Sequence, residues 1–326
     1  MKLHSIACVI DGNIIKEVRR GEATSRKVLY DISVVRALRR LSCPVHLVGA
    51  VEQSARTIEE LVRLQPGIVV NLAFSADPFE PSFAGALEML GIPYTGSGPL
   101  GIGLANDKVR SRRLLEAAGI PVPRFVELAN ARRPRKIDLA PPFIVKPVSL
   151  ANSAGIHADS VVDSYGQALQ RADRIWRRFA VPAVCDEFIV GREFQVCLVE
   201  VARKVFRIAA IVELHFAGAK PGTGFKSEAV RIKGKTRRVH RISLRCPSLS
   251  RRKMTEMAEI ARTAANVLEL RGYAKLDLRM DDQERIRVIE ANANPGIWSK
   301  SPLWCRPSFE ANLRQILDSA LRRARE

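Results

Sequence analysis

The chain has 326 residues, a formal net charge of +19, and 47% hydrophobic and 27% charged residues. This length and apolar content predict a soluble globular protein of two or three domains. No apolar run approaches the roughly 18 residues of a membrane helix, and the N-terminal segment lacks a signal-peptide cleavage pattern. We therefore expect a cytoplasmic protein with no membrane segment.

The positive charge is compatible with nucleic-acid binding, but its distribution argues against that partner. Basic residues are spread over several segments without a recognition motif, and aromatic residues for base stacking are few. A nucleotide or an acidic small molecule explains the charge more simply. The six cysteines and five histidines are scattered without metal-ligand spacing, so we expect neither zinc nor disulfides.

The first 100 residues alternate between strand and helix patterns. The predicted strands cover 5–10, 45–51 and 67–72, and the predicted helices cover 28–41, 55–64 and 82–90. This alternation favours a parallel sheet covered by helices. A turn-rich connector at 92–98 follows, so we place a domain boundary near residue 100.

The remainder begins with a helix at 108–118, capped by Asp107. A strand at 142–147 ends in Lys146 and precedes a small-residue loop at 149–155. Further predicted elements are a helix at 164–179, strands at 181–190 and 193–201, a mobile lid at 216–235, a helix at 254–268 and a final helix capped by Ser308. The expected domains are 1–100, 101–190 and 191–326.

The stretch 272–301 reads as a β-hairpin, with alternating strands on either side of a polar turn at 281–284. With this four-residue loop, Asp277 faces Val288 and Lys275 faces Glu290. Asp277 and Glu290 then become diagonal neighbours with β-carbons roughly 7 Å apart.

Asn292 is expected just beyond the end of the second strand, where it adds an amide oxygen to the two carboxylates of Asp277 and Glu290. All-oxygen ligation suits Mg²⁺ that holds nucleotide phosphates. A surface hairpin with solvated charges is the alternative, but the full E-x-N-x-x-P-G spacing favours the metal site.

Six motifs occur in a fixed order and together resemble the D-alanine-D-alanine ligases of the ATP-grasp class, over residues 68 to about 305. They are IPYTGS, ANDK, IVKP, DEFIVGREF, LDL and IEANANPG. The resemblance implies a mixed α/β and α+β architecture: an ATP-grasp fold with an N-terminal Rossmann-like (preATP-grasp) parallel-sheet domain. Lys108 or Lys146 alone would be a weak signal for phosphate binding.

The resemblance also implies roles for individual residues. Those that would bind ATP are Lys108, Lys146, Ser153, Asp186, the hinge residues Glu187, Phe188 and Ile189, the ribose-binding Glu193, and Lys226 in the lid. Those that would bind two Mg²⁺ ions, with Mn²⁺ as an alternative, are Asp277, Glu290 and Asn292. Those that would act on the reacting groups are Lys275, which replaces an arginine of the family, Gly296 and Ser301.

The implied reaction is amide formation between an activated carboxylate and an amine, through an acyl phosphate, with amino acids or peptide-like metabolites as substrates. A homodimer through the N-terminal domain is a further implication. The family's glutamate and histidine for the first D-alanine have no counterpart at 71–75, and the loop at 151–152 departs from the usual glycine and serine. Authentic D-alanine-D-alanine synthesis and a non-catalytic nucleotide-binding protein therefore remain alternatives.

Overall fold

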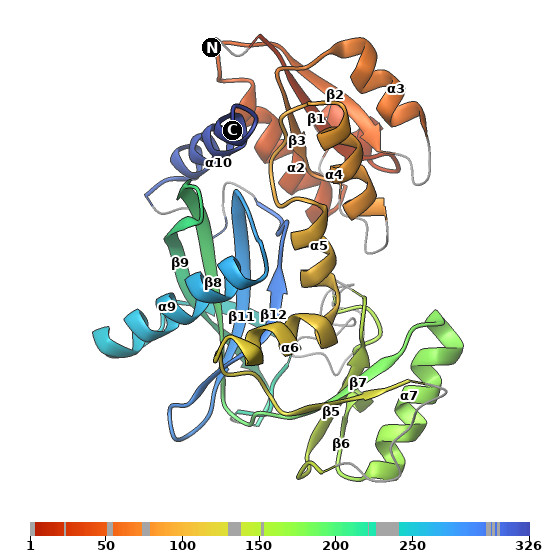
Figure 1. The fold of residues 1–326 in the computed structure, drawn as a ribbon, viewed down its shortest axis with the longest axis vertical. Coiled ribbons are helices and arrows are strands. Elements are labelled where there is room, and N and C mark those ends of the chain that lie inside the picture. The colour runs from red at the N-terminus through yellow and green to blue at the C-terminus, as the bar shows by residue number, and fades with distance from the viewer. Residues whose placement is uncertain are drawn as a thin grey trace.

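The computed structural model describes residues 4–22, 24–50, 55–73, 79–129, 138–150, 153–220, 222–225, 241–297, 301, 304 and 307–326. Figure 1 shows a parallel-sheet layer and helix α10 at one end of the molecule and a small sheet with helix α7 at the other. A larger antiparallel sheet lies between these two ends. None of the helices in these ranges is long and apolar enough to cross a membrane.

The N-terminal layer is a three-stranded parallel sheet, as the sequence predicts, and its strand order is β2-β1-β3. The strands are β1 (Ile6–Asp11), β2 (Val45–Ala50) and β3 (Ile68–Asn71), and the helices are α1 (Ile15–Arg20), α2 (Arg26–Leu38), α3 (Ala55–Leu64) and α4 (Phe79–Met89). The central strand β1 is apolar and buried from Ile6 to Ile10 because both of its faces are covered.

The middle part contains a four-stranded sheet in the order β4-β7-β5-β6. Its elements are α5 (Pro99–Asn106), α6 (Lys108–Ala117), β4 (Phe125–Leu128), β5 (Phe143–Pro147), the 3₁₀ turn η1 (Ala158–Ser160), β6 (Val161–Val162), α7 (Tyr165–Phe179) and β7 (Ala183–Glu187). The Asp107 carboxylate caps α6, as predicted, by accepting hydrogen bonds from the backbone N–H groups of Val109 and Arg110.

The third part is a five-stranded antiparallel sheet in the order β10-β9-β8-β11-β12. Its elements are β8 (Arg192–Ala202), β9 (Val205–Ala217), β10 (Arg241–Arg245), α9 (Arg251–Val267), β11 (Tyr273–Met280), β12 (Ile286–Asn292) and α10 (Phe309–Arg323). Strand β9 was not predicted, and it occupies the first residues of the segment expected to be a lid. Residue 221 and residues 226–235 of that segment lie outside the described ranges.

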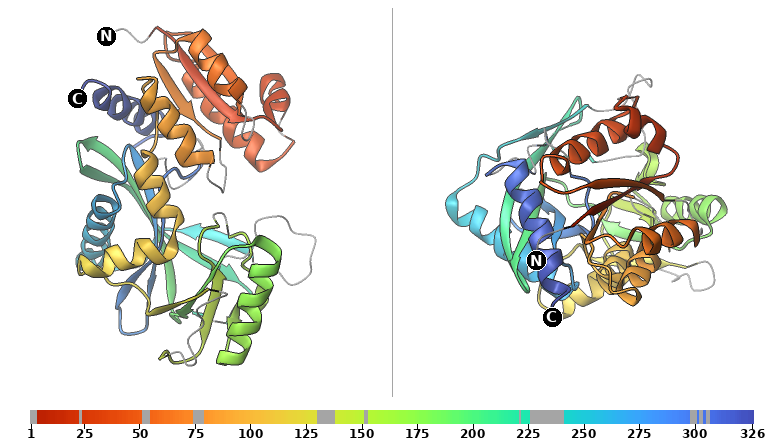
Figure 2. Two further views of the ribbon diagram at one scale, coloured as in Figure 1. Left: turned by 45° about the vertical axis from the view of Figure 1, so that its right-hand side comes forward. Right: turned by 90° about the horizontal axis from the view of Figure 1, so that it is seen from above.

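One apolar cluster joins the first layer to the five-stranded sheet. It contains Ile10 and Leu72 from the N-terminal layer, Cys197 and Tyr273 from the sheet, and Leu313 from α10. Figure 2 shows α10 beside the N-terminal layer in both further views. The division into domains at residues 100 and 190 stays a prediction, but packing is continuous across the first of these positions.

Candidate active site

The site is built on one face of the five-stranded sheet, where three neighbouring strands place polar side chains in register. Directly paired residues of antiparallel strands lie on the same face. Across β8, β11 and β12 the successive rows are Glu193, Arg279 and Arg287, then Gln195, Asp277 and Glu290, and then Cys197, Lys275 and Asn292. The sheet therefore gathers two carboxylates, two amides and a lysine within two adjacent rows.

The predicted register of the β11–β12 hairpin was wrong. Asp277 pairs directly with Glu290, and Lys275 pairs with Asn292, which is the last residue of β12. Val288 pairs with Leu278 on the opposite, buried face. The two carboxylates are therefore direct cross-strand neighbours, with β-carbons about 4.5–5.5 Å apart.

Two local features cause this difference in register. The connecting loop holds five residues because Asp281 accepts hydrogen bonds from the backbone N–H groups of Gln283 and Arg285, while Glu284 has φ 56°. A register shift between Asp277 and Leu278 then moves the remaining pairs by one more residue.

The paired carboxylates are held by cations and amides. The Lys275 Nζ lies 3.8 Å from the Asp277 Oδ1, and the Lys108 Nζ lies 3.7 Å from the Glu290 Oε1. Gln195 donates from Nε2 to the Asp277 Oδ1 at 2.7 Å. The Asn292 Nδ2 donates to the Lys275 carbonyl at 3.3 Å.

This donor set fits a hard divalent cation. Two carboxylates and an amide oxygen are the oxygen ligands that Mg²⁺ accepts beside substrate phosphates. Within the described ranges, no three His, Cys, Asp or Glu side chains cluster as a metal site, so the amide of Asn292 is needed to complete the set. The side chain of Asp277 is buried, with 4% exposure.

A second group of charges lies next to this row. Asp186 on β7 pairs with the Arg112 Nη1 at 2.6 Å and with the Lys146 Nζ at 2.9 Å. Arg112 also donates to the Ile289 carbonyl at 3.2 Å, which ties α6 to β12. Both Arg112 and Asp186 are 1% exposed, so the cluster is cut off from water.

Lys108 begins α6 and enters the same region from the side of the helix. Its Nζ donates to the carbonyl of Leu150, in the small-residue loop, at 2.6 Å. Burial lowers the pKa of Lys108, whereas the charge of Glu290 raises it. Lys108 and Arg112 are four residues apart, so one helical face supplies two buried cations.

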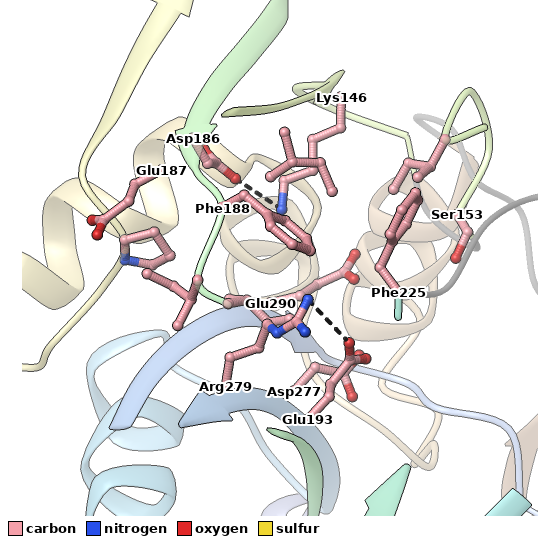
Figure 3. Close-up of a pocket in the computed structure, with 15 residues that line it drawn as sticks. Lys146, Ser153, Asp186, Glu187, Phe188, Glu193, Phe225, Asp277, Arg279 and Glu290 are labelled. Carbon is pink, nitrogen blue, oxygen red and sulfur yellow. Dashed lines mark ion pairs between the residues drawn. The ribbon is translucent and has the colours of Figure 1, made fainter. Parts of the chain in front are cut away.

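Residues of both antiparallel sheets border a pocket between them (Figure 3). Among the residues predicted to bind ATP or metal, those that line it are Lys146, Ser153, Asp186, Glu187, Phe188, Ile189, Glu193, Asp277 and Glu290. Apolar walls come from Pro123, Ile144, Ile156, Phe225 and Ile289. The pocket thus combines apolar surface for a base with charges for phosphates.

The other predicted residues lie outside this lining. Lys108 and Lys275 reach it through their ion pairs with Glu290 and Asp277. Gly296 follows strand β12, and its carbonyl accepts a hydrogen bond from the Trp304 Nε1 at 3.0 Å. Ser301 is fully buried, and its carbonyl accepts from the Trp304 backbone N–H at 3.1 Å. Lys226 lies outside the described residues.

Three polar or charged residues of the site were not predicted: Arg112, Gln195 and Arg279. A signal for each was present in the sequence. Arg112 follows Lys108 by one helical turn, and Gln195 and Arg279 continue the alternating faces of Glu193 and of Asp277. Their partners, however, are distant in sequence, so the pattern alone could not assign them a function.

A parallel-sheet layer, two antiparallel sheets and a charged pocket between these sheets define an ATP-dependent ligase of the ATP-grasp class. The family model of the D-ala D-ala ligase C-terminus matches residues 114–307. The chain belongs to the D-alanine-D-alanine ligase family.

Relatives agree with this assignment. The uncharacterised protein y4sG of Sinorhizobium fredii is 30% identical, over 82% of this chain and 76% of its own length. D-alanine–D-alanine ligase B of Chromobacterium violaceum is 28% identical, over 92% of this chain and 95% of its own. The crystal structure of the Bacillus anthracis D-alanine–D-alanine ligase complexed with ATP covers 99% of both chains with a TM-score of 0.75 and 17% identity, and it supports the fold.

Proposed function

We propose that this ligase activates a carboxylate as an acyl phosphate with ATP and joins it to an amine, and that its substrates are amino acids or peptide-like metabolites. The observation that carries the proposal is the pairing of Asp277 with Glu290 at the edge of the pocket, with Lys108 and Lys275 facing them. Paired carboxylates beside lysines suit a metal-bound phosphoryl group in transfer.

The nucleotide is assigned to the pocket of Figure 3. Lys108, Lys146 and Ser153 would bind the phosphates, the hinge 187–189 would hold the base, and Glu193 would accept hydrogen bonds from the ribose hydroxyls. Asp186, predicted near the adenine amine, has a second role here: its ion pair at 2.9 Å positions Lys146.

Asp277, Glu290 and Asn292 would bind two Mg²⁺ ions, and Mn²⁺ has the same ligand preference. When bound, the ions neutralise charge on the transferring phosphoryl group. The protein's own contribution is orientation: Gln195 holds Asp277 by a hydrogen bond of 2.7 Å, and Lys108 faces Glu290 at 3.7 Å.

Lys275, in the row next to Asp277 and Glu290, would stabilise the tetrahedral intermediate that forms when the amine attacks the acyl phosphate. It keeps the positive charge of arginine but loses the planar fork, so it stabilises the oxyanion as a point charge. The Gly296 N–H would donate to the same oxyanion. Ser301 would contact the carboxylate of the second substrate, and Lys226 would contact the nucleotide phosphates.

The test is phosphate release from ATP and Mg²⁺ with a panel of amino acids, using the wild type and the Glu290→Gln variant. We expect at least one substrate pair to release phosphate, and the variant to be inactive because it loses a charged ligand. Glu284→Gln, in the loop of the same hairpin, is the matched control and should retain the wild-type rate. A folded wild type that is silent with every pair, or an active Glu290→Gln, contradicts the proposal.

D-Alanine is the substrate named for several relatives. The segment that would contact the first D-alanine lacks the family's histidine, and its residues 74 and 75 lie outside the described ranges. Mass spectrometry of a reaction with D-alanine alone separates the two cases. Formation of D-alanyl-D-alanine would mean that the protein is an authentic D-alanine-D-alanine ligase. Absence of this product while another pair reacts would mean that its substrates are different.

A non-catalytic nucleotide-binding protein is the remaining alternative, and it predicts ATP binding without phosphate release.

We also propose a homodimer through the N-terminal layer. Light scattering after gel filtration measures the molar mass and tests this proposal. A mass of one 36.2 kDa chain contradicts it.

A further inference from the structure

Arg279 is a buried cation of the pocket that the proposed reaction does not use. It lies on β11, pairs with Glu193 on β8 and is 4% exposed. Placing a guanidinium in such an environment carries a desolvation cost, which must be offset by hydrogen bonds and opposite charge. The contacts of Arg279 therefore indicate the function of this side chain.

The first set of contacts joins two separate segments. The Arg279 Nη2 donates to the carbonyls of Gly191 and Gly222 at 3.0 Å each and to the carbonyl of Gly224 at 3.1 Å. Gly191 lies between the hinge and β8, whereas Gly222 and Gly224 belong to the segment Gly222–Phe225. The Gly191 N–H also donates to the Gly222 carbonyl at 3.0 Å.

The glycines allow this convergence of carbonyls. A Cβ at Gly191 would lie 2.0 Å from the Met280 carbonyl oxygen, and one at Gly224 would lie 2.4 Å from the Phe216 side chain. Gly222 has φ +74°, and a Cβ there would meet the Gly191 nitrogen at 3.0 Å. Side chains at these positions would push the segment away from the guanidinium.

The second set of contacts faces the nucleotide pocket. The guanidinium carbon lies 4.8 Å from the centroid of the Phe188 ring, and the Nη1 lies 3.9 Å from the Glu193 Oε2. Phe225 packs edge-on against Phe188, with ring centroids 6.1 Å apart. In Figure 3 the guanidinium lies between Phe188 and Glu193, the groups proposed to meet the base and the ribose.

A third observation concerns the Arg279 Nε–H. The Nε–H is buried, and no residue in the described ranges accepts a hydrogen bond from it. A buried donor without a partner is unfavourable in the folded state unless a ligand provides the acceptor. Because Arg279 lines the pocket, the acceptor would come from the molecule bound there.

We propose that Arg279 is the positioning residue of the nucleotide pocket: it fastens the Gly222–Phe225 wall to the hinge, holds Glu193 for the ribose, and keeps its Nε–H for an acceptor of the nucleotide. The proposal rests on the assignment of ATP to this pocket. It adds a determinant of nucleotide affinity and ribose recognition that no sequence motif indicates.

The experiment is isothermal titration of the full chain with ATP and with 2′,3′-dideoxy-ATP, each in excess Mg²⁺ and without a carboxylate substrate. Arg279→Met should weaken ATP binding about 10- to 100-fold, the loss expected for hydrogen bonds to a charged group. It should also reduce the preference for ATP over the dideoxy nucleotide, because Glu193 is no longer held. Arg279→Lys should recover only part of the affinity, since an ammonium cannot reproduce the fork.

Arg287→Met is the matched control. Arg287 pairs directly with Arg279 across β11 and β12, but its Nη1 contacts Asp281 at 3.1 Å, away from the pocket. We expect the variant's affinity for ATP to stay within about twofold of the wild type, because neither Arg287 nor Asp281 lines the pocket. Thermal melting of each variant checks folding, and Arg279→Lys carries the test if Arg279→Met does not fold.

The outcomes separate the proposals. Arg279→Met and Arg279→Lys variants that bind ATP as the wild type does would overturn the role of Arg279. An equal loss for ATP and the dideoxy nucleotide would overturn the part played through Glu193. A wild type that binds no ATP would overturn the assignment of the pocket itself, and with it this inference.

Discussion

Replacing Arg112 with methionine should destabilise the protein by about 3 kcal/mol, the lower end of the range for breaking a buried ion pair. Arg112 is 1% exposed, and its Nη1 lies 2.6 Å from the Asp186 Oδ1. The substitution also removes the donor to the Ile289 carbonyl. The lower end applies because Lys146 still faces Asp186 at 2.9 Å, so the carboxylate does not become fully unpaired.

Urea denaturation of the wild type, Arg112→Met, Asp186→Asn and the double variant measures this cost and its origin. Because the two side chains interact directly, the double variant should lose about 1 to 3 kcal/mol less than the sum of the single losses. Arg110→Met is the control on the same helix. Its side chain is 76% exposed, so we expect a change below about 0.5 kcal/mol.

Two results would refute this reasoning. A loss below about 1 kcal/mol for Arg112→Met would mean that the pair contributes no more than an exposed ion pair. Additive losses in the double variant would mean that Arg112 and Asp186 stabilise the protein independently. Either result would remove the basis for the view that Arg112 holds Asp186 beside Lys146.

Three further predictions concern Gln195, the buried Glu80 on α4 and Gly191. Gln195→Leu removes the 2.7 Å hydrogen bond to Asp277, so the Mg²⁺ concentration for half-maximal phosphate release should rise about 10-fold; an unchanged requirement would exclude an orienting role. Burial raises the pKa of Glu80 to about 7, so the folded state binds the extra proton. The free energy of unfolding should then fall by up to about 3 kcal/mol as pH rises from about 4.5 to 7. Urea denaturation across this window should show a flatter profile for Glu80→Gln, and parallel profiles would contradict the assignment. Gly191→Ala places a Cβ 2.0 Å from the Met280 carbonyl oxygen and should lower stability by about 3 kcal/mol in thermal melting, whereas a wild-type melting temperature would mean that the backbone yields freely.

The sequence predicted the order of the N-terminal strands and helices and most of the residues around the pocket. The alternation of Lys275, Asp277 and Arg279 is a local property of one strand, so it indicates correctly that these side chains share a face. The pairing with β12 depends on the loop, where the side-chain hydrogen bonds of Asp281 add one residue to the turn. Such geometry is not encoded in hydrophobic periodicity, and the predicted register failed for this reason.

Long-range ion pairs were equally inaccessible to the sequence. Arg112 and Asp186 are separated by 74 positions, and nothing near either residue identifies the other as its partner. Strand β9 was not predicted either; the positive φ of Lys204 reverses the chain after β8, and β9 then pairs along β8. Tertiary packing decides both cases.

The position of α10 has a consequence for the order in which the protein can fold during synthesis. Its residues complete the apolar cluster of the N-terminal layer, and Glu310 pairs with Arg40 across 270 positions of sequence. The apolar face of the layer therefore lacks its last partner until α10, whose Glu310 follows Arg40 by 270 positions, has left the ribosome. Until then the nascent layer exposes a surface that favours aggregation or chaperone binding. The folding yield should therefore depend more strongly on α10 than the chemistry of the site does.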